Sequence, residues 1–221
     1  MLINLRNALM TGKKIPYIET FAAAGQWADT GIKSAGSYLR IIIQFAMTRF
    51  KTSESTEGYQ YIFSGDYSGG QRWTSAEVIV GDTPATQARL GKRVAANIGS
   101  DTTRTWSTTR LNLEDIYLLD FEAKTSPSKT LTMKGTFTAS YTYQGYGPST
   151  GNINLFRAMH ATSLNCVPYT RIFGIQMFTS PNVLAADFVP MGNGTTGFLH
   201  DKVRGADLYS QGGTPWGFGV V

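Results

Sequence analysis

The chain has 221 residues, of which 42% are apolar and only 16% are charged. This composition excludes an intrinsically disordered protein, and the length suits one large β-sandwich domain. The formal charge of +5 is spread along the chain without a run of five or six basic residues, so the sequence predicts no nucleic-acid partner.

The first 17 residues differ from the rest and are predicted to form a separate N-terminal arm. Apolar side chains recur there at helix-like intervals, at Leu2, Leu5, Leu9 and Met10. Basic side chains lie between and after them, at Arg6, Lys13 and Lys14. The arm either packs on its own domain or anchors the chain to a partner, and the sequence leaves both open. Neither a signal peptide nor a stretch of 18 apolar residues occurs, which predicts synthesis in a cytoplasm and no membrane insertion.

From residue 18 to residue 221 the sequence predicts many short strands in one domain. The segment 38–50 (YLRIIIQFAMTRF) is apolar at nearly every position, which predicts a central strand covered on both faces. Further strands are expected at 59–65, 72–80, 88–98, 103–109, 116–124, 131–137, 152–159, 169–178, 186–189 and 197–200. Glycine-rich and proline-containing turns separate them, and no helical pattern intervenes. This spacing favours an all-β fold of two antiparallel sheets.

Three local features refine this expectation. Pro190 is expected to stop a strand, because proline has no backbone N–H to donate. Alternation at residues 197–201 places Phe198 and His200 on one face of a strand and Leu199 on the other. The stretch 141–151 (YTYQGYGPSTG) is expected to be a loop.

Seven short motifs carry a resemblance to a known family. They are QWADTGI (26–32), YIFSG (61–65), NLFRAM (154–159), RIFGIQMF (171–178), LAADFVPM (184–191), GFLHDKV (197–203) and LYSQGGTPWG (208–217). In order and spacing they resemble the LamG-like, concanavalin A-like jelly-roll domain of structural proteins from gut bacteriophages and prophages. The region 66–150 departs from the family pattern, so any specialised function is expected there.

The resemblance implies a non-enzymatic virion component, carried as a capsid decoration, a head fibre or a tail-associated protein. Its partners would be other virion proteins and further copies of itself, and its location would be the virion. An alternative is a carbohydrate-binding adhesion module for host or mucosal glycans. The aromatic residues considered for stacking on sugars are Trp73, Trp106, Tyr141, Tyr143 and Tyr146. For the two tryptophans, core packing is the favoured interpretation.

A third alternative, a glycoside hydrolase, rests on Asp120 and Glu122, which share one face of a predicted strand. Related sandwich-fold hydrolases resemble the pattern E-x-D-x-E, but Leu118 takes the place of the first glutamate. We therefore expect no catalytic residue, and we interpret the two carboxylates either as exposed polar positions on a half-buried strand or as partners for nearby basic side chains.

No cofactor or metal site is predicted. His160 and His200 lack the spacing of metal ligands, and the single cysteine, Cys166, is expected to be a buried apolar residue. Three carboxylates in predicted loops could bind calcium, although turn capping is the favoured interpretation for them: Asp66, Asp82 and Asp101.

Overall fold

A computed structural model describes residues 15–21, 26–50, 59–65, 73–79, 93–99, 104–143, 147–157 and 168–221. The regular elements of this described part are β-strands. The larger sheet contains β1 (Pro16–Phe21), β3 (Tyr38–Arg49), β8 (Ile116–Lys124), β9 (Thr130–Gly135), β10 (Ala139–Thr142), β12 (Tyr169–Ser180), β13 (Val183–Asn193), β14 (Thr196–Asp201), β15 (Ala206–Leu208) and β16 (Trp216–Val220). The smaller sheet contains β2 (Ala28–Lys33), β4 (Tyr59–Gly65), β5 (Trp73–Ile79), β6 (Arg93–Gly99), β7 (Arg104–Arg110) and β11 (Asn152–Leu155).

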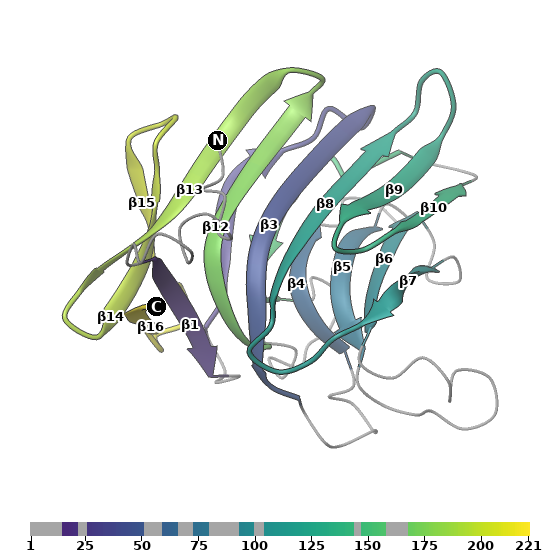
Figure 1. Cartoon of the computed structure of the whole chain (residues 1–221). Coiled ribbons are helices and arrows are strands. Elements are labelled where there is room, and N and C mark those ends of the chain that lie inside the picture. The colour runs from purple at the N-terminus through teal and green to yellow at the C-terminus, as the bar shows by residue number, and fades with distance from the viewer. Residues whose placement is uncertain are drawn as a thin grey trace.

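The two sheets are antiparallel and stack face to face, as the sequence predicts. The larger sheet runs in the order β1-β16-β14-β13-β12-β3-β8-β9-β10, with β15 paired to β14, and the smaller sheet in the order β2-β11-β4-β5-β6-β7. Figure 1 shows β4, β5 and β6 behind β3 and β8. None of the described segments is a helix long and apolar enough to cross a lipid bilayer.

The core lies between the sheets and is built by alternation. In β8, Tyr117, Leu119, Phe121 and Ala123 are buried, and the residues between them are half-buried on the outer face. Phe121 meets Phe63 of β4 edge to face, with the ring centroids 5.1 Å apart. Because β3 lies between β12 and β8, its apolar character agrees with the predicted central strand.

One end of the larger sheet closes into a ring of strands. β1 pairs with β12 through Ile18 and Ile172, and also with β16 through Ile18 and Phe218. β16 then pairs with β14, β14 with β13, and β13 with β12. Glycines permit the close packing inside this ring, since a Cβ at Gly192 would lie 2.1 Å from Cγ of Phe218.

The structure corrects two expectations in this region. The last residues of the predicted 1–17 arm belong to the sheet, because Ile15 exchanges two backbone hydrogen bonds with Val221 and β1 begins at Pro16. Residues 1–14 lie outside the described part. Pro190 does not stop β13, which continues to Asn193.

The position of Pro190 explains why a proline is tolerated. Lys202 N donates to Asp187 O, so the odd-numbered residues of β13 direct their backbone groups toward β14. Pro190 therefore faces the β12 side, where the pairing of β13 ends at Phe188. No ladder hydrogen bond is lost there.

Candidate functional site

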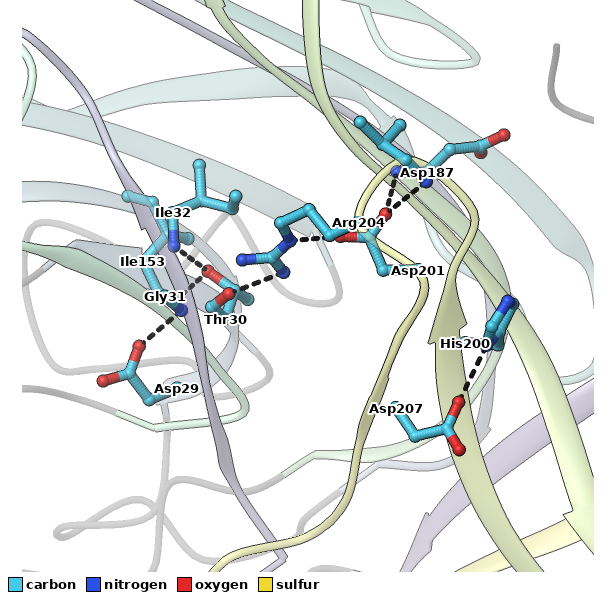
Figure 2. Close-up of polar contacts among 11 residues, drawn as sticks. Asp29, Thr30, Gly31, Ile32, Ile153, Asp187, His200, Asp201, Arg204 and Asp207 are labelled. Atoms are coloured by element: carbon cyan, nitrogen blue, oxygen red, sulfur yellow. Dashed lines mark hydrogen bonds and ion pairs between the residues drawn. The ribbon is translucent and has the colours of Figure 1, made fainter.

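A surface pocket of about 340 Å³ lies where the two sheets meet at one edge. The smaller sheet contributes Asp29, Thr30 and Gly31 of β2, and β13 of the larger sheet contributes Phe188. The remaining lining residues follow β14 in the chain: Arg204, Ala206, Asp207, Leu208 and Gln211. Figure 2 shows the polar contacts that hold these two groups in place. The volume falls within the range of pockets that bind small ligands.

The centre of this network is the carboxylate of Asp201, which is 0% exposed. It accepts hydrogen bonds from Asp187 N at 3.1 Å, from Val203 N at 2.9 Å and from Nε of Arg204. Burial by itself would raise the pKa of Asp201, but these hydrogen bonds and the Arg204 charge hold it below the ordinary value. The ionised carboxylate therefore fixes the tight turn that follows β14.

Arg204 also connects this turn to the smaller sheet. Its Nη2 donates to the carbonyl oxygen of Thr30 at 2.9 Å, and its guanidinium lies 5.6 Å from the ring centroid of Phe188. Its Nη1 has no hydrogen-bond partner among the described residues and lies beside Gly31, where a Cβ would be 3.4 Å away. Gly31 has a φ of 68°, a conformation that favours glycine. The two N–H groups of Nη1 thus stay available at the pocket wall.

The β2 wall is held by Asp29 and Thr30. Asp29 accepts from Gly31 N at 2.7 Å through one oxygen and from Asn152 Nδ2 at 2.6 Å through the other. Thr30 Oγ1 donates to Ile153 O at 2.7 Å. Each carboxylate oxygen of Asp29 keeps a second lone pair for a ligand hydroxyl.

The opposite wall ends at Asp207, whose carboxylate is turned toward His200 (Figure 2). Asp207 Oδ1 and His200 Nδ1 lie 2.8 Å apart on the β14–β15 hairpin. Tyr209, which is 51% exposed, follows the pocket residue Leu208 and packs against Phe198 with a centroid separation of 5.1 Å. An exposed aromatic ring therefore lies close to the pocket rim.

These groups offer a mixed surface to a ligand. Arg204 Nη1 and the Gln211 side chain can donate hydrogen bonds, and Asp29 and the Gln211 carbonyl can accept them. Ala206 and Leu208 supply apolar contact. No group of three or more His, Cys, Asp or Glu residues within the described ranges could hold a metal ion. The pocket is suited to a small polar molecule with an apolar face.

Two of the aromatic residues that the sequence singled out, Tyr141 and Tyr143, do not line the pocket. Tyr143 is 2% exposed, and its hydroxyl donates to Lys124 O at 3.0 Å. Burial raises its pKa to about 12. We therefore correct the expectation that Tyr143 stacks on a sugar, because its ring is packed in the core. Tyr141 is half-buried in β10 and packs against the same core, so the predicted 141–151 loop begins two residues later.

The remaining predicted site residues lie wholly or in their side chains outside the described part. Trp73 begins β5 and Trp106 lies in β7, both in the smaller sheet, and their side chains lie outside the described part. Further predicted residues lie outside the described ranges altogether: Leu2, Leu5, Arg6, Leu9, Lys13, Lys14, Asp66, Asp82, Asp101, Tyr146, His160 and Cys166.

Asp120 and Glu122 occupy the outer face of β8, and both have protein partners. Asp120 receives two hydrogen bonds of 2.7 Å from Arg40, one from Nε and one from Nη2. Glu122 accepts from the Tyr38 hydroxyl at 2.9 Å. The interpretation of Asp120 as a partner for a basic side chain is confirmed.

Sequence reasoning missed Asp29, Arg204, Asp207 and Gln211 as site residues. Asp29 belongs to the motif QWADTGI and Arg204 directly follows the motif GFLHDKV, but the sequence presents both motifs only as determinants of the fold. Asp29 also caps its own turn, because its carboxylate accepts from Gly31 N. The signal that could have revealed the site is the proximity of the two motifs in the folded chain.

Comparison with known proteins establishes the fold class. No protein-family model matches the chain, and no curated protein matches its sequence. The structure of a putative carbohydrate binding protein from Bacteroides ovatus is similar with a TM-score of 0.57 at 9% identity, covering 94% of this chain and 59% of that one. Domains LG4-5 of the mouse laminin α1 chain give a TM-score of 0.51 at 9% identity, covering 79% and 48%. A heptameric SAP-like pentraxin from Limulus polyphemus gives 0.46 at 9%, covering 76% and 71%.

The first two likenesses show that the chain has an all-β, concanavalin A-like jelly-roll fold of the LamG type. At 9% identity they show the fold alone. The chain spans about three fifths of the Bacteroides protein and about half of the laminin fragment.

Proposed function

We propose that this chain is a non-enzymatic carbohydrate-binding domain and that the pocket between β2 and the β14–β15 hairpin receives a sugar. The observation that carries the proposal is Arg204, which is fixed at two nitrogens and leaves Nη1 beside the pocket. Sugars are bound by fixed donors and acceptors that read their hydroxyls and by apolar contacts with the ring. The Bacteroides ovatus protein, which shares this fold, is itself named a putative carbohydrate binding protein, and this supports the same activity here.

Two arrangements support a role without catalysis. Asp120 is held by Arg40, and Leu118 takes the place of the first glutamate, so β8 lacks the E-x-D-x-E pattern of related hydrolases. At the pocket, the Asp201 carboxylate is buried and bonded to Arg204 and two backbone N–H groups. The carboxylates of this face and this pocket thus have structural partners.

A glycan array tests the proposal. We expect the wild-type chain to bind at least one class of glycan, and we expect Ala206→Phe to abolish that binding because the added ring occupies the pocket. Val203→Phe is the matched control: Val203 lies in the same turn, is exposed and does not line the pocket. Equal loss in both variants, or binding that survives Ala206→Phe, contradicts the assignment of the site.

A second proposal concerns where the domain is carried. Four of the seven motifs that resemble phage structural proteins overlap strands of the ring, namely β12, β13, β14 and β16, and the resemblance supports a virion component present in several copies among other virion proteins. Detection of the chain by mass spectrometry in purified, nuclease-treated particles, at a constant ratio to the major capsid protein, is the expected result. Its absence from such particles contradicts this setting and leaves the sugar site unaffected.

A further inference from the structure

The charge around the pocket is opposite in sign to the charge of the whole chain. The chain carries a formal charge of +5, which would favour acidic polymers. Of the described lysines and arginines, Arg204 is the one that lines the pocket. It faces three carboxylates, two of them in the lining and one directly behind it: Asp29, Asp207 and Asp201.

The single guanidinium is already committed to a buried carboxylate. Asp201 holds Nε of Arg204 and is 0% exposed, so the pair presents little net charge to a ligand. Asp29 is bonded to a backbone N–H and to a side-chain amide, both neutral, which leave its negative charge uncancelled. Asp207 is bonded to His200. Even with His200 protonated, three carboxylates outnumber two cations.

We infer that the pocket selects uncharged sugars and rejects sugars that carry a carboxylate or a sulfate. The inference rests on the proposed function and adds the class of ligand. A hydroxyl can donate a hydrogen bond to Asp29 and accept one from Arg204 Nη1, so a neutral sugar can form hydrogen bonds with both residues. An anionic group can accept a hydrogen bond from Arg204 but cannot donate one to Asp29, and the charges of Asp29 and Asp207 repel it. The local carboxylates therefore override the positive charge of the rest of the surface.

The test compares polymers that differ only in charge. Polygalacturonate, glucuronan and polymannuronate are each paired with their carboxyl-reduced counterparts, which keep the same linkages. Binding is measured by calorimetry in about 0.15 M salt, where charges within about 8 Å still interact. We expect at least one reduced polymer to bind more tightly than its acidic parent by about fivefold to tenfold. The difference should shrink when the salt concentration is raised.

Two variants show whether the selection is local. Asp29→Asn and Asp207→Asn should each narrow the preference for the reduced polymer, because each removes a negative charge at the pocket. Glu122→Gln changes the net charge by the same amount on the outer face of β8 and should leave the preference unchanged. Circular dichroism and thermal unfolding of each variant establish that the fold is retained.

The outcomes separate the two proposals. If an acidic polymer binds as tightly as its reduced counterpart or more tightly, and Ala206→Phe abolishes that binding, the inference is overturned while the sugar site stands. If binding of an acidic polymer survives Ala206→Phe and disappears at high salt, that binding belongs to the basic surface outside the pocket. The inference then stands if a reduced polymer binds through the pocket and is overturned if none does. If no reduced or acidic polymer and no glycan on the array binds through the pocket, both proposals are overturned.

Discussion

Arg204 and Thr30 lie 174 residues apart in the chain, and a hydrogen bond of 2.9 Å joins Nη2 of the first to the carbonyl oxygen of the second. The bond connects the hairpin of the larger sheet to β2 of the smaller sheet. Because Nε of the same guanidinium is held by the buried Asp201, one side chain fixes both walls of the pocket. Stability and the proposed ligand binding therefore depend on the same residue.

Replacement of Arg204 should destabilise the fold. In Arg204→Gln the buried Asp201 loses its charged partner and Thr30 O loses a donor, and we expect the free energy of unfolding to fall by about 2–3 kcal/mol. The Arg204 side chain is 37% exposed, which keeps the estimate below that of a fully buried pair. Urea denaturation measures the change. Lys202→Gln removes one positive charge from the same exposed turn and should cost less than about 0.5 kcal/mol. Equal effects of the two variants would refute the role of the pair.

Stability should depend on acid pH through Asp201. Its pKa is lowered in the folded state, so its contribution is complete above the ordinary aspartate pKa of about 3.9 and is lost as the pH falls through the lower folded value. Between about pH 5 and pH 2 we expect wild-type stability to decline more steeply than that of Asp201→Asn, which lacks the titrating group. Urea midpoints at several pH values test this expectation. If the urea midpoints of the two proteins change with pH in parallel, the protonation of Asp201 does not affect stability.

The packing of Phe218 on Gly192 predicts an effect of a single methyl group. Gly192→Ala should lower the free energy of unfolding by about 1–3 kcal/mol, because the new Cβ would overlap the ring at 2.1 Å. Adding Phe218→Ala should cancel this specific penalty in a double-mutant cycle measured by thermal unfolding. Gly194→Ala is the control, since it has open space but a φ of 63°. Gly194→Ala should cost about 1 kcal/mol because alanine disfavours the positive φ, and this cost should be the same with and without Phe218→Ala. A cycle without coupling between Gly192 and Phe218 would contradict the packing.

Truncation tests the boundary of the N-terminal arm. Deletion of residues 1–14 should leave a folded domain, because β1 and its pairing with β12 and β16 remain. Deletion of residues 1–21 removes Ile18, which is 0% exposed, and should abolish the cooperative thermal transition. If the shorter deletion also unfolds the protein, residues 1–14 are part of the core and do not form a separate arm.

Alternation and turn chemistry are sufficient to predict the long strands. The segments around β3, β8, β12 and β14 are expected within a few residues of their observed bounds, because their apolar residues meet the opposite sheet. The predicted strand at 88–98 is observed from Arg93 within the described residues, and the strand at 152–159 ends at Leu155. Strands β1, β2, β10, β15 and β16 are not predicted. β16 reads WGFGV, in which glycines replace the side chains that would reveal alternation.

The pocket could not be predicted in the same way. Its walls come from residues 29–31 and 204–211, and only the folded chain brings these segments together. A search for aromatic residues leads instead to Tyr143, whose hydroxyl finds a carbonyl partner inside the core. Sequence alone does not show whether a tyrosine has such a partner.

The ring that β1 and β16 close also determines where other chains can add a strand. An open edge exposes unpaired N–H and C=O groups that can recruit further strands and lead to aggregation. At the closed end, the described strands leave only the three-residue β15 as such an edge, whereas the far end of the larger sheet terminates in β10. Many copies of the domain could therefore be crowded together through this end with little risk of fibrillar association, and within the larger sheet β10 is where protective charges would matter most.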